Sequence, residues 1–194
     1  MTAAAAPPAG GAAPAREPAL TVTVYGDPAA QGSKAYKGHR TSRVTGRQVA
    51  VLAEQSKMVK PWRALVTAAA VRAIAGTRAA ARADAAPGSG SPPAAPLAGP
   101  LAVAVVFTMP RPGRIPGDRL GWPAVRPDGD KLLRAVFDGL TDARAWGDDG
   151  QVVQWSGIKV YPGLHPLALP VPGAHIRIWQ VAATPATHTP GGEQ

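Results

Sequence analysis

The sequence predicts a single small domain of the α/β (α+β) class, in which a mixed β-sheet is covered by two main helices. Three observations support this. Apolar residues alternate with polar or small ones in four segments, two other segments repeat their apolar residues at helical spacing, and Pro- and Gly-rich stretches lie between them. The length of 194 residues suits one domain with a substantial core. The expected order is β, basic loop, α, β, α, β, β.

Four strands are expected at residues 20–25, 101–109, 151–162 and 174–179. In the first, Leu20, Val22 and Val24 alternate with polar side chains. The third should contain a β-bulge near Gly157, because its alternation slips there.

The first helix is predicted to begin at Pro61, since proline is favoured in a first turn, and to continue to residue 83. Its expected apolar stripe consists of Trp62, Leu65, Val66, Ala69, Ala73 and Ile74. The second helix should begin near Asp130, with Asp128 as its N-cap. The side chains that it is expected to bury are Leu133, Val136 and Leu140.

The ends of the chain are expected to lie outside the folded domain, which we place at 19–182. Residues 1–18 and 183–194 are poor in large apolar side chains and are predicted to be disordered tails. Residues 85–100 should form a flexible internal linker. The N-terminus lacks a basic, leucine-rich leader and no eighteen apolar residues run uninterrupted, so a cytoplasmic protein with no membrane partner is expected.

Basic residues are concentrated before and at the start of the first helix. Between Ala29 and Arg63, eight basic residues accompany one acid, Glu54, giving 8 − 1 = +7 within a chain of net charge +9. Such a cluster is typical of a nucleic-acid site, and a solvated loop is the alternative. The basic residues expected to bind DNA, here and in the loop 111–126, are Lys34, Lys37, Arg40, Arg43, Arg47, Lys57, Lys60, Arg111, Arg114, Arg119 and Arg126.

Acidic residues gather elsewhere, with seven of the twelve between Asp118 and Asp149. Capping explains Asp128 without a metal, but adjacent carboxylates such as Asp148 and Asp149 repel unless a cation or proton intervenes. Because cysteine is absent, any metal must be held by oxygen or imidazole. Mg²⁺ prefers oxygen ligands and often joins carboxylates to a phosphate, so metal-assisted phosphodiester hydrolysis is the leading chemistry. An Asp-rich turn without a metal is the alternative.

Most of the tryptophans and histidines are expected to have structural rather than catalytic or ligand-binding roles. We expect Trp62, Trp146, Trp155 and Trp179 to lie in the core rather than to stack on bases. Trp122, in the Pro-rich loop, is a candidate for a DNA wedge or a dimer contact. The four histidines show no metal-ligand spacing.

The run RPDGDKLLRAVFDGL at 126–140, followed by WGDDGQVV at 146–153, closely resembles the central motif of RusA-type Holliday junction resolvases, the crossover junction endodeoxyribonucleases. That motif has Asp-x-Asp-Asn, a basic residue four positions after the second Asp, Asp-x-Leu closing the helix, and Asp-Asp-x-Gln-Val opening a strand. QGSK at 31–34 and KPWR at 60–63 resemble the phage and prophage members. The resemblance covers most of residues 20–180.

The resemblance implies a Mg²⁺-dependent homodimer, with Mn²⁺ as a possible substitute, that makes paired symmetric nicks in four-way DNA junctions during recombination and repair. Such an enzyme would be nucleoid-associated. The metal ligands implied are Asp128, Asp130 and Asp149, which would be catalytic together with Arg134. Asp148 and Lys131 would have supporting roles.

Two positions depart from the family pattern. Lys131 stands where Asn is usual, and Arg134 stands where Lys is usual. The planar guanidinium of Arg and the point charge of Lys are not interchangeable. These substitutions leave a non-catalytic branched-DNA-binding protein possible. The retained acids argue against it, because carboxylates repel phosphate. A metal-dependent nuclease acting on flaps or other branched DNA is a further alternative, which a panel of substrates rather than the sequence would distinguish.

Overall fold

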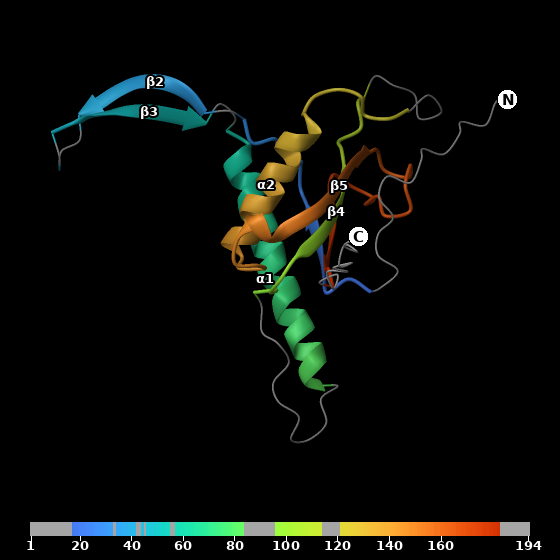
Figure 1. Cartoon of the computed structure of the whole chain (residues 1–194). Coiled ribbons are helices and arrows are strands. Elements are labelled where there is room, and N and C mark those ends of the chain that lie inside the picture. Colours follow the sequence, from blue (N-terminus) through green and yellow to red (C-terminus); the bar gives the residue numbers. More distant parts are fainter. Residues whose placement is uncertain are drawn as a thin grey trace, which may run out of the picture.

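The computed structural model describes residues 17–32, 34–41, 44, 46–54, 57–83, 96–113 and 121–182 (Figure 1). Its elements are, in order, β1 (Leu20–Tyr25), β2 (Lys34–Thr41), β3 (Gln48–Glu54), α1 (Val59–Ala83), β4 (Leu101–Thr108), α2 (Gly129–Asp142), the 3-10 helix η2 (Asp149–Gln151), β5 (Val152–Val160) and β6 (Gly173–Gln180). The predicted small α+β domain, a mixed sheet with two main helices, is confirmed.

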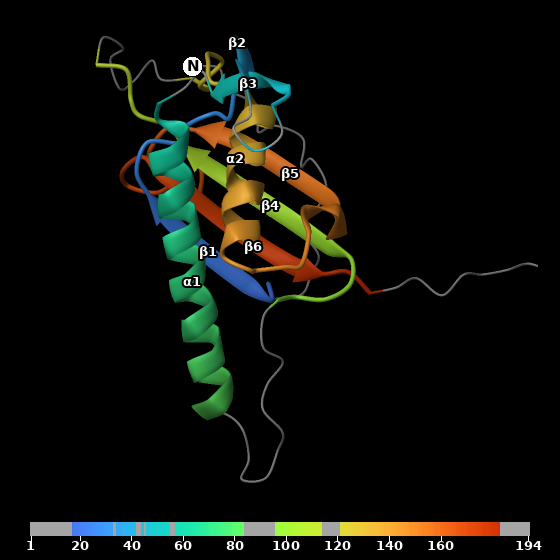
Figure 2. The same cartoon turned by 90° about the vertical axis from the view of Figure 1, so that its left-hand side faces the viewer.

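The main sheet has four strands in the order β1-β6-β4-β5. β5 runs parallel to β4, whereas the β1–β6 and β6–β4 pairs are antiparallel. Both helices lie over one face of this sheet (Figure 2). Parallel neighbours cannot be joined by a tight hairpin, so the chain crosses over between β4 and β5, and α2 lies in this crossover.

The core lies between the sheet and the helices. It includes Val22 and Ile176 from the sheet and Leu132 and Leu140 from α2, all fully buried or nearly so. Burial of each such side chain contributes about 1.5–3 kcal/mol. Gly139 lets the helices pack closely, because a Cβ there would lie 2.8 Å from Val66 Cγ1 of α1.

α1 differs in detail from the prediction. It begins at Val59 rather than Pro61, and its buried residues are Val59, Trp62, Val66, Ala69, Ala70 and Ile74. Leu65 was expected in the stripe but is 44% exposed, at the margin of the packed face beside Gly26. By length and composition alone α1 could span a membrane, but the core helix of a domain passes the same test, and the buried side of α1 packs in this core.

The predicted bulge in β5 is wrong in position. The register between β4 and β5 shifts at Val153, whereas Gly157 pairs regularly with Val105. Gly157 has a packing role instead, since Leu133 of α2 lies 3.2 Å from the position a Cβ would occupy. The slipped alternation thus reflects close contact between α2 and β5.

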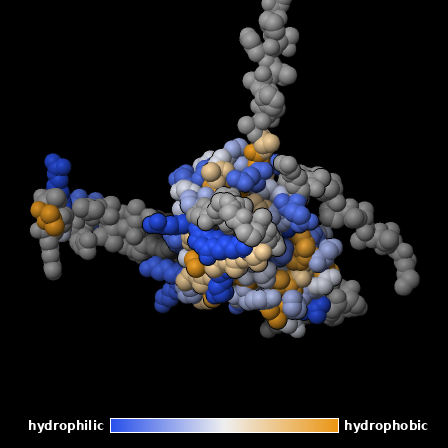
Figure 3. All heavy atoms as spheres, turned by 90° about the horizontal axis from the view of Figure 1, so that it is seen from below, coloured by the Kyte–Doolittle hydropathy of each residue, from blue (hydrophilic) through white to orange (hydrophobic). Residues whose placement is uncertain are grey.

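The basic segment forms the antiparallel β2–β3 hairpin, a two-stranded sheet separate from the main one. Figure 1 shows it extending away from the body of the domain, and in Figure 3 the coloured atoms at its outer end stand apart from the domain surface. The basic segment was expected to be a loop, but it is a projecting pair of strands, with Lys34, Lys37 and Arg40 in β2.

The predicted tails fall almost wholly outside the described residues, and their disorder stays a prediction. Of the predicted linker at 85–100, the structure describes residues 96–100. Leu97 forms a β-bridge with Trp146, and its N–H donates to the Ala145 carbonyl at 2.8 Å. The Gln151 side-chain amide donates to the carbonyls of Leu97 and Gly99 at 3.1 and 3.0 Å. These bonds fasten the segment before β4 to the start of β5.

Candidate functional site

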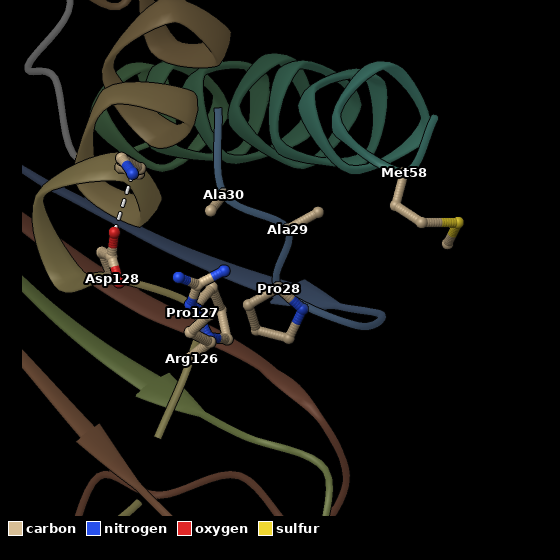
Figure 4. A pocket seen from close by; sticks show the side chains of 8 residues that line it. Pro28, Ala29, Ala30, Met58, Arg126, Pro127 and Asp128 are labelled. Carbon is tan, nitrogen blue, oxygen red and sulfur yellow. Dashed lines mark ion pairs between the residues drawn. The ribbon is translucent and has the colours of Figure 1, made fainter. Parts of the chain in front are cut away.

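Two pockets lie against different faces of the first turns of α2. The Asp130 pocket, of about 510 Å³, is lined by Gly129, Asp130, Leu133, Arg134, Phe137, Asp149, Trp155, Ser156 and Gly157. The Asp128 pocket, of about 460 Å³, is lined by Pro28, Ala29, Ala30, Met58, Arg126, Pro127, Asp128 and Lys131 (Figure 4). Of the four residues predicted to be catalytic, the structure brings three into the Asp130 pocket and places Asp128 in the other.

The Asp130 pocket is built from α2, η2 and β5. Asp130 and Arg134 are four residues apart on α2 and so are neighbours on one helical face. Asp149 comes from η2, at the end of the crossover that leads into β5. Asp130, Arg134 and Asp149 are all exposed to solvent. Two carboxylates and one guanidinium therefore line a cavity that solvent and a large ligand can reach.

Asp148 has a structural role beside this pocket. As the N-cap of η2, its Oδ1 accepts from the Gly150 N–H at 2.8 Å. Gln151 completes a capping box, because its Oε1 accepts from the N–H groups of Asp148 and Gly147 at 3.1 and 2.8 Å. These bonds fix the backbone on both sides of Asp149. The sequence analysis placed Gln151 in the family motif but did not predict this capping role, although its spacing from Asp148 fits a capping box.

In the Asp128 pocket the carboxylate is already paired. Asp128 occupies the predicted N-cap position of α2, but its side chain makes no capping hydrogen bond. Lys131 Nζ lies 2.8 Å from Asp128 Oδ2 instead (Figure 4, dashed line). The hydrogen bond and the charge of Lys131 lower the pKa of Asp128 below its ordinary value. The pair is thus a local charge neutralisation at the start of the helix.

Lys159 of β5 fastens the loop that leads into α2. Its Nζ donates to the carbonyls of Val125 and Pro127 at 2.6 and 3.0 Å. Sequence reasoning missed this residue, since its partners lie more than thirty positions away. One signal could have pointed to it. Lys159 pairs with Phe107, so a charged residue lies on the side of the strand that faces the helices.

Asp138 does not join the pocket, although it continues the helical stripe of Asp130 and Arg134. It lies 3.3 Å from Arg63 of α1, whose Nε and Nη2 also donate to Asp142 at 2.5 and 2.7 Å. The hydrogen bond from Arg63 lowers the pKa of Asp142. These two acids therefore hold α1 against α2.

The donor set of the Asp130 pocket fits Mg²⁺. Among the described residues, no three Asp, Glu, His or Cys side chains are grouped as a complete metal site. Mg²⁺ does not require such a group, because it keeps several waters and is commonly held by one or two carboxylates and a substrate phosphate. Asp130 and Asp149 are suitable carboxylates, and water and phosphate would complete the coordination.

The residues predicted to bind DNA are spread over several surfaces. Lys34, Lys37 and Arg40 have their backbones in β2, and Arg47, Lys57, Lys60, Arg111 and Arg126 are exposed. Arg126 lines the Asp128 pocket. Arg43, Arg114 and Arg119 lie outside the described residues. Lys57 and Lys60 lie at the start of α1, Arg126 lies shortly before α2, and Arg111 follows β4.

One tryptophan differs from its expected place. Trp62, Trp146 and Trp179 are buried, as predicted, but Trp155 is 59% exposed and lines the Asp130 pocket. Because β5 is an edge strand, its helix-facing side is covered only where α2 reaches it. The expected core position of Trp155 is therefore wrong. Trp122 is exposed, and its role as a wedge or dimer contact stays a prediction.

Comparison with known proteins agrees with the motif. Residues 77–167 match the family model described as endodeoxyribonuclease RusA. This range contains all of β4, α2, η2 and β5, and so every residue that lines the Asp130 pocket. A search of curated proteins gave no match. The resemblance seen in the sequence is confirmed, because residues 77–167 match the RusA endodeoxyribonuclease family.

Proposed function

We propose that this protein is a Mg²⁺-dependent endonuclease that resolves four-way DNA junctions by paired symmetric nicks, in recombination and repair. The observation that carries the proposal is the gathering of Asp130, Arg134 and Asp149 in one accessible pocket within the family-matching segment. A protein that only binds DNA gains nothing from carboxylates placed where phosphate must approach, because they repel it.

In the proposed site Asp130 and Asp149 hold the metal. When bound, Mg²⁺, or Mn²⁺ in its place, supplies a water of lowered pKa and offsets negative charge on the phosphate. Arg134 holds the scissile phosphate from the same helical face as Asp130. Its planar guanidinium can donate two parallel hydrogen bonds to phosphate oxygens and stabilise the charge that develops there during cleavage. Leu133 and Phe137 give the pocket an apolar wall.

The ion pair between Asp128 and Lys131 changes the set of metal ligands that the family resemblance implies. The family resemblance makes Asp128 a third metal ligand, but its carboxylate is held by Lys131 on the other side of the turn. We propose that Asp128 supports the site mainly by keeping Lys131 and the helix start in place. Asp148 supports it by fixing the backbone around Asp149.

DNA would be held by the basic residues outside the pocket. The hairpin carries its lysines and arginines away from the body of the domain, where they can reach a DNA arm distant from the cut (Figure 1). Lys57, Lys60 and Arg126 are exposed nearer α2 and can bind phosphates closer to it. Two symmetric cuts require two pockets, so we propose a homodimer that acts on DNA at the nucleoid.

The test is a cleavage assay with a labelled four-way junction, a Y-flap and a linear duplex, each with Mg²⁺ or EDTA. We expect paired nicks near the junction centre that EDTA abolishes and that Asp130→Asn lacks. Asp138→Asn is the matched control, because it removes a carboxylate of the same helix that faces α1.

Other outcomes would change the proposal. Preferential cutting of the flap would favour a nuclease for other branched DNA. Tight junction binding without cleavage under any divalent metal would favour a binding protein. Full activity of Asp130→Asn would show that the pocket is not the site of cleavage.

A further inference from the structure

Trp155 combines an exposed aromatic ring with a place in the Asp130 pocket. More than half of its surface is accessible, and it shares the cavity with Asp130, Arg134 and Asp149. We propose that Trp155 is a stacking platform for an unpaired nucleobase next to the phosphodiester that is cut. This role rests on the proposed function, because it assumes that DNA is cut in this pocket.

The exposure of Trp155 follows from the geometry of β5. Trp155 pairs with Val103 and therefore lies on the side of the sheet that the helices cover. On that side the next residue along β5 is Gly157, which Leu133 of α2 contacts closely. α2 thus covers β5 at Gly157 and leaves the ring of Trp155 largely open. Among the described strands only β4 lies beside β5, so no strand of the sheet lies on the outer side of the ring.

The residues that share the pocket with Trp155 indicate which ligand would stack on its ring. Arg134 is suited to a phosphate, and each phosphate of a DNA strand is joined to nucleotides whose flat bases lie next to it. An aromatic ring in the same cavity is therefore within one nucleotide of the phosphate that Arg134 would hold. Base–aromatic stacking stabilises binding by about 1–3 kcal/mol per base without demanding a particular sequence.

Stacking on Trp155 would also select the substrate. Bases in a linear duplex are paired and stacked, and freeing one costs a few kcal/mol, whereas a base at a branch point is more easily released. A platform beside the cut therefore favours branched over linear DNA. The charged groups of the pocket can accept the phosphodiester of any DNA. Stacking on Trp155 would add a preference for branched DNA.

A second copy of this chain is the competing occupant. Val153, also on β5, is exposed as well, so the edge strand could carry a subunit contact. The pocket that Trp155 shares with three charged groups favours the nucleobase, because subunit contacts are generally depleted in charge at their centre. Measurement of the oligomeric state separates the two.

The experiment uses a four-way junction with 2-aminopurine at the branch point, in EDTA so that binding occurs without cleavage. We expect the wild-type protein to change the fluorescence of the probe on binding. Trp155→Ala should abolish that change and weaken junction binding by about 5- to 150-fold, the range that 1–3 kcal/mol of stacking gives. Duplex affinity should change little, and Trp155→Phe should retain most of the junction affinity.

Tyr25→Ala is the matched control, because Tyr25 is an exposed aromatic residue on the opposite edge strand, β1. It should leave junction binding unchanged, and circular dichroism should show that each variant is folded. Equal losses on junction and duplex, or dissociation of Trp155→Ala into monomers by sedimentation, would overturn the stacking role.

The stacking role and the proposed cleavage fail in different ways. Junction binding that depends on Trp155, in a wild-type protein that cuts no DNA with any metal, would sustain the platform and refute cleavage. A wild-type enzyme that resolves junctions, with Trp155→Ala binding them equally well, would refute the platform and leave cleavage intact.

Discussion

The Asp130 pocket and the Asp128 pocket are similar in size and share the first turns of α2, but their charges are arranged differently. In the Asp128 pocket the carboxylate is neutralised by Lys131. Within the part of the chain that the structure describes, neither Asp130 nor Asp149 forms an ion pair with a basic side chain. Charges left available to a ligand distinguish a candidate reaction site from a pair that stabilises a helix start.

The largest expected effect is at Asp130. Asp130→Asn should reduce junction cleavage by at least about 10³-fold, in the range found when a catalytic group is removed. Junction binding in EDTA should stay near the wild-type value, because the variant removes only a negative charge from the proposed DNA-binding surface. Single-turnover cleavage and a binding titration measure the two effects. Normal cleavage by this variant would show that the Asp130 pocket is no more the reaction site than the Asp128 pocket is.

Replacement of Arg134 should have the next largest effect. Arg134→Ala is expected to slow cleavage by about 10²–10³-fold, as for loss of one group that stabilises transition-state charge. Arg134→Lys restores the residue usual in the family and keeps the charge but not the planar fork. It should recover part or all of the rate. Equal rates for the Ala and Lys variants would show that the charge at this position is not used in cleavage.

Asp128→Asn tests the comparison directly. If the Asp128–Lys131 pair is structural, cleavage should fall less than about 10-fold, and calorimetry should show Mg²⁺ binding close to that of the wild type. If Asp128 leaves Lys131 and joins the metal, as the family resemblance implies, the loss should equal that of Asp130→Asn. Lys131→Asn, which restores the usual family residue, should then tighten Mg²⁺ binding.

The smallest effect concerns acid pH. Lys131 lowers the pKa of Asp128 below its ordinary value of 3.8, so Lys131→Met should raise it again. Because the folded-state pKa is depressed, the pair stabilises the fold above about pH 3.8 and loses that contribution as pH falls through the folded value. NMR titration of the Asp128 carboxyl carbon measures the shift. An unchanged pKa in the variant would show that Lys131 is not its partner in solution.

Much of the fold follows from local patterns in the sequence. Alternation located β1, β4 and β6, and helical spacing located α2 and placed Asp130 beside Arg134. The capping rule also placed the start of α2 correctly at Asp128. It could not show that the carboxylate pairs with Lys131, since a capping hydrogen bond and an ion pair at this spacing are alternative uses of the same side chain.

The remaining features depend on contacts between distant segments. The exposure of Trp155 depends on how far α2 covers an edge strand, which no alternation within β5 reveals. Gly157 interrupts the alternation as a bulge would, but its cause is Leu133. The bonds from Lys159 to the loop before α2 likewise join segments that only the completed crossover brings together.

The separate β2–β3 hairpin has a consequence for how such a protein can change. Its strands pair with each other and not with the main sheet, so substitutions or altered length there leave the register of the other strands untouched. In the proposed function, DNA binding by the hairpin and cleavage at the Asp130 pocket can therefore diverge independently between relatives. Transplanting a hairpin from one relative to another would alter the footprint on DNA while the chemistry of the recipient is preserved.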